Sequence, residues 1–218
     1  MLFKEMLKAL PNALTIQVIC LDELEGNSYA NKAQYLANSL SSSELFIVAE
    51  SYSGPLAYAL CNILGSKVKQ LVLLASFISA PSLLSRFAHL IPVFALKPSK
   101  LNIWLLNKVG FASSANKNQV SDVFKSISFA NKTKLKNRLH NISRLSKPKN
   151  LHATPVVYIK PTNDLLVNSR AVDDVKSVFS NTKVVTINGG HFIAQTHSIE
   201  CANIIKRAID EYKTTQYF

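Results

Sequence analysis

The sequence has little of what builds metal, redox or phosphate-binding sites. It has three cysteines in 218 residues, and Cys20, Cys61 and Cys201 lie too far apart to form a zinc-knuckle or redox motif. All three lie in largely apolar segments, so we expect buried apolar positions and no need for an oxidising compartment. The sequence has no metal-ligand constellation and no glycine loop suited to a phosphate, so no cofactor is expected.

Signals for export or membrane insertion are also lacking. Lysine and glutamate residues interrupt the apolar positions of Met1–Leu10, which excludes the continuous apolar stretch of a signal peptide. The longest apolar region, Leu71–Leu96, contains prolines and polar residues and falls short of the roughly 20 apolar residues of a spanning helix. These observations predict a soluble, cytoplasmic protein.

Acidic residues are scarce in the middle of the chain. The sequence has 25 basic and 13 acidic residues, a net charge of +12, and Lys97–Lys149 carries nearly all of this excess with Asp122 as its one acidic residue. Lysine-rich stretches such as Lys132–Arg138 either form a solvated helix face or attract an acidic partner. An acyl carrier protein, an anionic lipid surface and nucleic acid are the candidate partners. Nucleic acid is the least favoured, because no binding motif is present.

What the chain does contain is a regular alternation of apolar runs and helical patterns. Its 48% hydrophobic content predicts one domain with a good core. The expected strands are Thr15–Leu21, Leu45–Ala49, Leu71–Ala75, Pro155–Lys160 and Lys183–Ile187. The expected helices are Tyr29–Leu40, Pro55–Leu64, Ser169–Phe179 and Ile199–Tyr212. Continuously apolar strands that alternate with helices predict an α/β fold, with a mostly parallel, doubly wound sheet covered on both faces.

The middle of the chain interrupts this alternation. Only helical patterns occur between Pro81 and Lys149. We therefore expect residues 1–80 and 150–218 to form the α/β core and residues 81–149 to form a helical cap or lid, called the cap segment below. The shape of such a cap would set the substrate, so the sequence does not identify one.

Ser51 is the strongest candidate for chemistry. Ala49-Glu50-Ser51-Tyr52-Ser53 lies between a buried strand and a helix, the setting of a nucleophile elbow. The residues two before and two after the serine must be small, and Ala49 and Ser53 meet this need although glycine is commoner at both. Gly54 is expected to add backbone freedom. The alternative is an ordinary polar turn between a strand and a helix.

Two later residues strengthen the case for Ser51. Asp164 follows the strand Pro155–Lys160, and His191 follows the strand Lys183–Ile187. Open α/β sheets build their sites at the carboxyl ends of strands, so we expect these side chains to lie close together. The order serine, aspartate, histidine is that of α/β-hydrolases and differs from the orders in chymotrypsin-like and subtilisin-like proteases.

The stretches FIVAESYSGPLA, PVVYIKPTNDLLV and GGHFIAQTHSIECANII resemble the elbow, acid loop and histidine loop of the α/β-hydrolase superfamily of esterases, lipases and thioesterases. The resemblance implies Ser51 as nucleophile and His191 as general base. It also implies that Asp164 orients the histidine and that the amide of Tyr52 donates one oxyanion hydrogen bond. A surface-turn role is the competing interpretation of Asp164.

Other candidates for these roles are weaker. Ser53 would need Pro55 as its small follower, and Asp173 and Asp174 fall in a helical pattern where solvated side chains are expected. His197 lies at the start of the last helix, where a capping or surface role is expected. The remaining histidines have no strand-end context and are expected to be structural or exposed: His89, His140 and His152.

The resemblance also points to a missing part. In this superfamily further strands precede the equivalent of Thr15–Leu21, and a loop after one of them supplies the second oxyanion N–H. Here Met1 corresponds to the helix after that loop, so we expect an N-terminally short form that lacks about 10²–10³ in rate. A truncated gene, a natural short form with another donor and a chain without catalysis are the alternatives, and the first is preferred. The sheet edge left exposed predicts a partner or dimer.

Three functions remain open from the sequence. The first is a serine hydrolase that cleaves a carboxylic ester or thioester through an acyl-enzyme, and an apolar cap with basic faces would suit acyl substrates. The second is a non-catalytic α/β-hydrolase-like protein that binds an acidic partner through the cap segment. The third is an inactive fragment, which predicts poor solubility.

Overall fold

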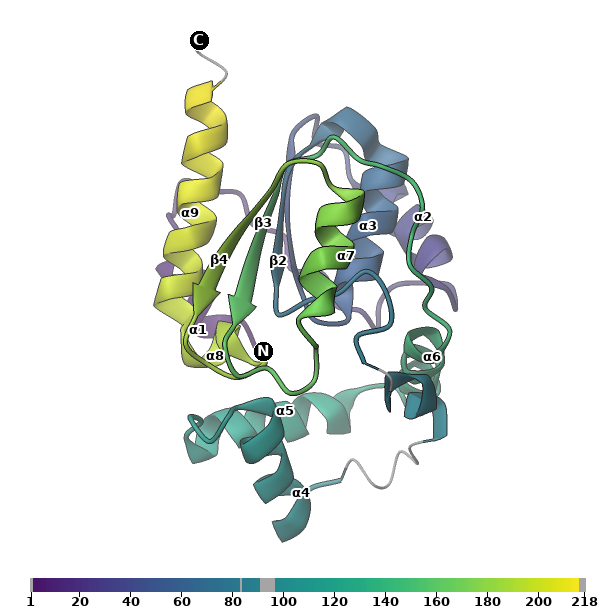
Figure 1. Ribbon diagram of the computed structural model, residues 1–218, viewed down its shortest axis with the longest axis vertical. Helices are drawn as coiled ribbons and strands as arrows, with labels where there is room; N and C mark the ends of the chain where they lie inside the picture. Colours follow the sequence, from purple (N-terminus) through teal and green to yellow (C-terminus); the bar gives the residue numbers. More distant parts are fainter. Residues whose placement is uncertain (1, 83, 91–96, 216–218) are drawn as a thin grey trace.

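The computed structural model describes residues 2–82, 84–90 and 97–215 and contains one parallel four-stranded sheet. Its strands are β1 (Leu45–Glu50), β2 (Val68–Leu74), β3 (Val156–Pro161) and β4 (Thr182–Ile187), and they lie side by side in that order (Figure 1). Each strand pairs in parallel with the next, which requires a crossover between consecutive strands. The predicted strands from residue 45 onward are therefore confirmed, with ends shifted by one to three residues.

One face of the sheet is covered by helices from the two ends of the chain. These are α1 (Lys4–Ala9), the short α8 (Ile193–Thr196) and the long α9 (Ser198–Thr215). Side chains such as Val72 and Ile159 pack there against Cys201 and Ile205 of α9 and Met6 of α1. Burial of these apolar side chains accounts for most of the stabilisation on this face.

The opposite face is covered by α3 (Ser53–Leu64) and α7 (Arg170–Val178), while α2 (Tyr29–Ser39) packs on α3. Leu71 and Tyr158 of the sheet contact Cys61 of α3 and Val175 of α7 in one buried cluster. Adjacent strand residues thus point to opposite faces, as the alternation of side chains along a strand requires. The expected doubly wound architecture is confirmed.

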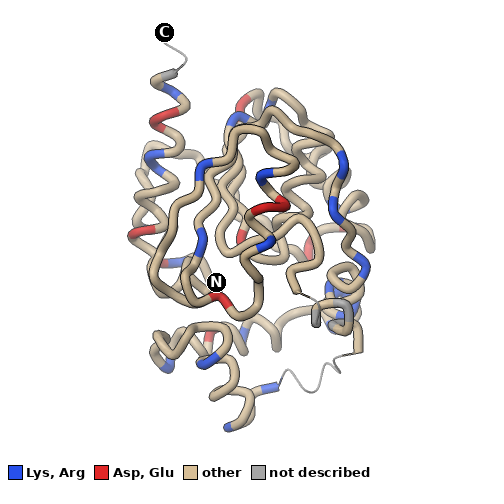
Figure 2. The backbone as a smooth tube through the Cα atoms, viewed as in Figure 1, with Lys and Arg blue, Asp and Glu red and all other residues tan. Residues whose placement is uncertain are grey.

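The cap segment lies beyond the carboxyl ends of the strands (Figure 1). Its described elements are η2 (Leu84–Leu90), α4 (Lys100–Leu105), the π-helical turn η4 (Leu106–Gly110), α5 (Lys117–Phe129) and α6 (Lys132–Ser143). Residues 83 and 91–96 of the predicted cap lie outside the described residues. Figure 2 shows lysine and arginine distributed over these helices, in agreement with the basic composition of the segment.

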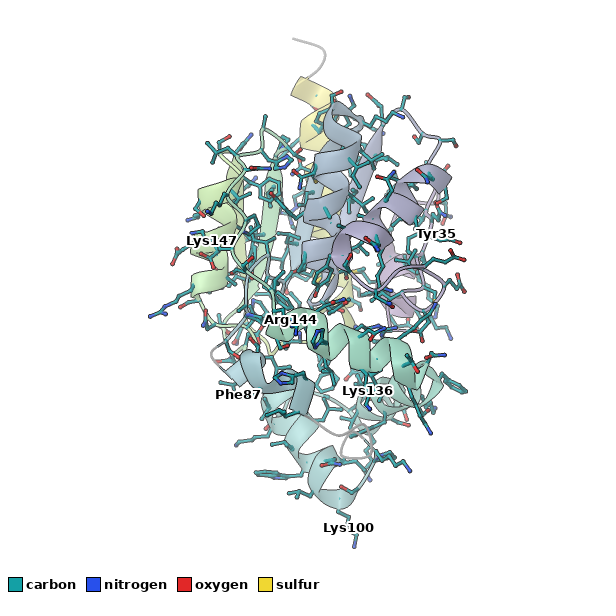
Figure 3. All side chains as sticks on the ribbon, turned by 90° about the vertical axis from the view of Figure 1, so that its right-hand side faces the viewer. Tyr35, Phe87, Lys100, Lys136, Arg144 and Lys147 are labelled. Atoms are coloured by element: carbon teal, nitrogen blue, oxygen red, sulfur yellow. The ribbon has the colours of Figure 1, made fainter. Side chains whose placement is uncertain are left out.

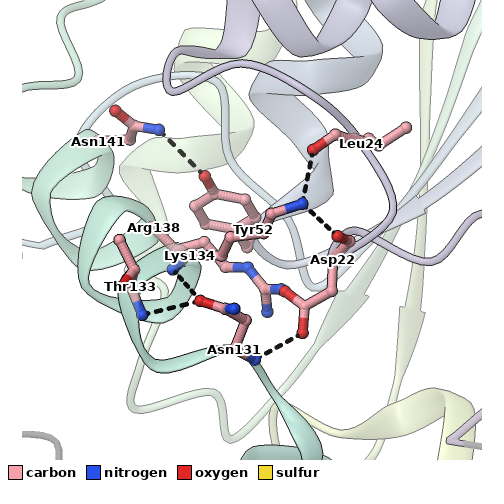
Figure 4. A network of polar contacts seen from close by, with 8 residues as sticks. All are labelled: Asp22, Leu24, Tyr52, Asn131, Thr133, Lys134, Arg138 and Asn141. Atoms are coloured by element: carbon pink, nitrogen blue, oxygen red, sulfur yellow. Dashed lines mark hydrogen bonds and ion pairs between the residues drawn. The ribbon is translucent and has the colours of Figure 1, made fainter.

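Helix α6 is tied to the loop that precedes α2 (Figure 4). Arg138 pairs with the carboxylate of Asp22, and the side chain of Lys134 donates to the carbonyl oxygens of Asp22 and Leu24. The N–H of Asn131 donates to Asp22 Oδ2 at 3.0 Å. Asp22 thus neutralises part of the positive charge of the cap and fixes one end of α6 to the core.

Two expectations about the N-terminal part are wrong. Thr15–Leu21 forms no strand, and its residues are exposed or half-buried. A β-branched sequence favours a strand only where a neighbouring strand supplies hydrogen bonds, and no printed strand pairing includes this segment in the described part of the chain. Cys20 lies in this segment and is therefore exposed, whereas Cys61 and Cys201 are buried as expected.

Among the described residues, no helix combines the length and apolar character that crossing a bilayer requires.

Candidate active site

Ser51 occupies a sharp turn between strand β1 and helix α3. The strand ends at Glu50, and the helix begins at Ser53. Ser51 has a φ angle of 50°, in the left-handed region that residues other than glycine rarely adopt. Such strained backbone persists only where the surrounding structure enforces it, and it concentrates at functional sites.

Hydrogen bonds enforce the turn from both sides. The N–H of Ser51 donates to the Leu74 carbonyl at 3.0 Å, and the Ser76 hydroxyl donates to the Ser51 carbonyl at 2.8 Å. The Ser53 hydroxyl donates to the Glu50 carbonyl at 2.7 Å. Ser53, the rival nucleophile, therefore holds the turn together, while the hydroxyl of Ser51 stays available.

Gly54 contributes to this turn through close packing. A Cβ atom at this position would lie 2.2 Å from Ser76 Oγ and 2.3 Å from the carbonyl oxygen of Phe77. The expectation that Gly54 supplies backbone freedom is wrong, because Ser51 itself takes the positive φ and Gly54 lies within α3. The first turn of α3 runs so close to the chain after β2 that no side chain fits.

Asp164 lies on the loop after strand β3, at the same edge of the sheet as Ser51. Its Oδ1 atom accepts hydrogen bonds from the backbone N–H groups of Leu166 at 2.8 Å and Val167 at 2.9 Å. The side chain is 6% exposed. These two amide donors fix the carboxylate so that its Oδ2 atom faces His191. Asp164 is therefore a buried, oriented carboxylate, unlike an ordinary surface-turn residue.

His191 follows strand β4 on a loop that packs against the cap segment. A Cβ atom on Gly190 would lie 2.5 Å from the carbonyl carbon of Phe111 and 2.7 Å from the nitrogen of Ala112. The N–H of Phe192 donates to the Gly110 carbonyl at 3.2 Å. The glycine thus lets the histidine loop lie directly on the end of η4, which restricts its position.

The three predicted residues meet in a continuous hydrogen-bonded chain. Ser51 Oγ lies 2.7 Å from His191 Nε2, and His191 Nδ1 lies 2.8 Å from Asp164 Oδ2. With the Nδ1 proton facing the carboxylate, Nε2 is left as the acceptor for the serine proton. The His191 side chain is 3% exposed, so surrounding water competes little for these bonds. Such an arrangement is able to deprotonate a hydroxyl while the carboxylate holds the imidazole.

The weaker candidates lie in other settings. His197 precedes α9, and its carbonyl accepts the N–H of Cys201 at 2.9 Å, a capping role. His152 Nε2 lies 2.9 Å from Asn62 Oδ1. Asp174 departs from the solvated role expected of it, because it accepts from Ser79 and lies 2.9 Å from Lys147 Nζ. The remaining candidates are exposed or lie against each other: Asp173, His89 and His140.

Tyr52, the predicted oxyanion donor, directly follows Ser51. Its ring lies 5.0 Å from that of Tyr29, and its hydroxyl accepts a hydrogen bond from Asn141 of α6 at 3.3 Å (Figure 4). Burial raises the pKa of the Tyr52 hydroxyl, which therefore stays protonated at neutral pH. The side chain of Tyr52 thus links the nucleophile turn to the cap segment.

Glu50 is a residue of this site that sequence reasoning did not identify. Its carboxyl is buried, Oε1 has no hydrogen-bond partner, and Oε2 lies 3.5 Å from Gln195 Nε2. Burial raises the pKa of the Glu50 carboxyl to about 7, and nearby His191 and Gln195 offset this effect only in part. The position directly before the nucleophile was the one signal that could have pointed to it.

Glu50 predicts that stability falls as the pH rises. A carboxyl whose pKa rises from 4.5 to about 7 on folding binds its proton more tightly in the native state, so its contribution is complete below about pH 4.5. Ionisation on passing pH 7 then removes roughly 3 kcal/mol of unfolding free energy. Glu50→Gln should abolish this loss in urea unfolding at acidic and alkaline pH. Equal pH dependence in wild type and variant would contradict the prediction, and the exposed Glu25→Gln is the matched control.

No known family model and no curated protein matches the sequence. Solved structures do match. A thermophilic esterase from Thermogutta terrifontis has a TM-score of 0.73 at 10% identity, covering 97% of this chain and 85% of the esterase. The epoxide hydrolase CorEH has a TM-score of 0.69 at 12% identity, with coverage of 98% and 87%.

A third similar structure is MGS-M2, described as an α/β hydrolase enzyme from a Medee basin deep-sea metagenome library. Its TM-score is 0.69 at 14% identity, covering 85% of this chain and 73% of that one. At such identities the likeness concerns the fold, which agrees with the parallel sheet and flanking helices described above. The chain has the fold of the α/β-hydrolase superfamily.

Proposed function

We propose that this protein is a serine hydrolase that cleaves a carboxylic ester or thioester through an acyl-enzyme. The observation that carries the proposal is the hydrogen-bonded chain from Ser51 Oγ through His191 to Asp164, with separations of 2.7 and 2.8 Å. It is supported by the backbone strain at Ser51, which projects the serine from the end of β1. The esterase among the similar structures agrees with this class of reaction.

The reaction proceeds in two stages. His191 takes the proton of Ser51 as the serine oxygen attacks the substrate carbonyl carbon, and the amide of Tyr52 donates to the oxyanion that forms. His191 then protonates the departing alcohol or thiol, which leaves the acyl group on Ser51. Water deprotonated by His191 attacks this ester and releases the acid. Asp164 stabilises the imidazolium in both stages.

The cap segment is proposed as the unit that shapes access to this site. Its η4 turn contacts the histidine loop, and Asn141 of α6 contacts Tyr52 beside the nucleophile. Both contacts lie at the carboxyl end of the sheet, where a substrate reaches Ser51. The division into a core of residues 1–80 and 150–218 and a cap of residues 81–149 remains a prediction on this basis.

A fluorophosphonate probe tests the proposal directly, because it reacts with a serine only when a neighbouring base activates the hydroxyl. Mass spectrometry of the labelled protein is expected to place the adduct on Ser51. Ser51→Ala should abolish labelling, whereas Ser53→Ala is the matched control and should retain most of it. Absence of labelling in folded wild-type protein would contradict the proposal and favour a non-catalytic binding function.

A further inference from the structure

Helix α4 and the turn η4 expose apolar side chains at the end of the cap segment farthest from the sheet. No residue of α4 is buried, and Leu101 and Trp104 are 68% and 60% exposed. Ile103 and Leu105 are also exposed. Figure 3 shows Lys100, the first residue of α4, at the tip of this end. A helix in a monomeric soluble domain normally turns its apolar side chains toward a core, so this exposure marks an interaction surface.

A groove lies between α4 and α5, with a volume of about 660 Å³. Its apolar lining includes Ile103 and Trp104 from α4 and Phe124 from α5, and three lysines also line it: Lys100, Lys117 and Lys125. We call these six side chains, together with Leu101, the α4–α5 face. The face therefore combines apolar side chains with ammonium groups on long flexible stems.

Charge selects the partner. Lys125 Nζ lies 3.6 Å from Asp122 Oδ1, whereas Lys100 and Lys117 have no printed ion pair within the described residues. The cap helices around them are rich in lysine and arginine (Figure 2). A second copy of the chain would bring the same positive charge to the interface and be repelled. The face requires a partner that is negatively charged at its surface and apolar beneath it.

We propose that the α4–α5 face binds an anionic lipid bilayer. Trp104 and Leu101 enter the boundary between headgroups and acyl chains, and the three lysines contact lipid phosphates. This division suits the two materials of a bilayer, since tryptophan favours the interface and lysine extends its ammonium to the headgroups. Binding of this kind requires no chemistry at Ser51, so the proposal stands independently of the hydrolase function.

The chain provides its own reporter for this binding. Trp104 is the single tryptophan in the sequence, and it is largely exposed. Titration with vesicles of phosphatidylglycerol and phosphatidylcholine in equal parts should shift its fluorescence emission to shorter wavelength. Lipids brominated on their acyl chains should quench it. Pure phosphatidylcholine vesicles should give neither effect, and added salt should weaken binding to the anionic vesicles.

Variants separate the two parts of the face. Reversal of all three lysines, Lys100→Glu with Lys117→Glu and Lys125→Glu, should lower the partition coefficient roughly a hundredfold or more. Leu101→Ser keeps the reporter and should lower it about tenfold by removing one inserted side chain. The matched control for charge carries Lys176→Glu, Lys206→Glu and Lys213→Glu, exposed positions on α7 and α9. It should bind more tightly than the first triple variant.

Co-sedimentation with the same vesicles gives a second measurement on wild-type protein, and Ser51→Ala should sediment like wild type. The proposal is overturned if wild type shows neither sedimentation nor a fluorescence shift with anionic vesicles at low salt. It is also overturned if both triple variants lose binding equally, which would indicate attraction by net charge alone. A dimer in analytical ultracentrifugation that Leu101→Ser dissociates would instead assign the face to a second copy.

Discussion

Replacement of His191 by glutamine is expected to lower kcat for hydrolysis of a nitrophenyl ester about 10⁴-fold or more, because no other side chain lies 2.7 Å from Ser51 Oγ to take its proton. Asp164→Asn is expected to cost about 10⁴-fold. Asparagine keeps one oxygen for the N–H groups of Leu166 and Val167, so the loop stays in place. Its amide group then faces His191 Nδ1 and favours the wrong tautomer.

The control for these substitutions is Asp173→Asn, because Asp173 is exposed on α7. It should leave kcat unchanged. Thermal unfolding of each variant separates loss of catalysis from loss of folding, and the rate of fluorophosphonate labelling should fall in the same order as kcat. If His191→Gln retained wild-type labelling and hydrolysis, His191 would not be the general base.

Gly54→Ala is expected to destabilise the protein by about 3 kcal/mol or more and to reduce activity. The added Cβ would lie 2.2 Å from Ser76 Oγ and 2.3 Å from the Phe77 carbonyl oxygen. The carbonyl belongs to buried backbone and is unable to move aside. Displacement of the Ser76 hydroxyl would also remove its 2.8 Å bond to the Ser51 carbonyl, which holds the nucleophile turn.

Gly65→Ala is the matched control for Gly54→Ala. Gly65 ends α3 with a φ of 53°, and a Cβ there would meet nothing within 4 Å. Its replacement tests backbone strain without crowding, and we expect a cost of about 1 kcal/mol. Urea unfolding measures both variants. A cost for Gly54→Ala no greater than that for Gly65→Ala would show that the packing around α3 relaxes easily.

Local sequence signals predicted most of the core because they are strong there. Buried strands such as Leu71–Ala75 are continuously apolar, and each is followed by turn-forming residues. The rule that parallel strands share a carboxyl edge then brought Ser51, Asp164 and His191 to one place before any coordinate was considered. Chain order alone was enough for this inference.

Thr15–Leu21 shows where local signals fail. Its β-branched composition favours a strand, yet it forms none. Strand propensity describes how well side chains fit a pleated surface, and the strand itself exists only when a neighbour supplies backbone partners. The same lack of a partner accounts for the exposure of Cys20, which an apolar neighbourhood in the sequence did not reveal.

The sequence by itself determined which residues end the strands, and therefore which side chains meet at the candidate site. Only the tertiary structure decided their environment. It buried Glu50 beside His191, placed Gly54 against the Phe77 backbone, and left Trp104 exposed. Strand ends depend on local periodicity, which a sequence contains. Burial and close contact depend on which distant segment packs at a given point, and that is settled only when the elements assemble.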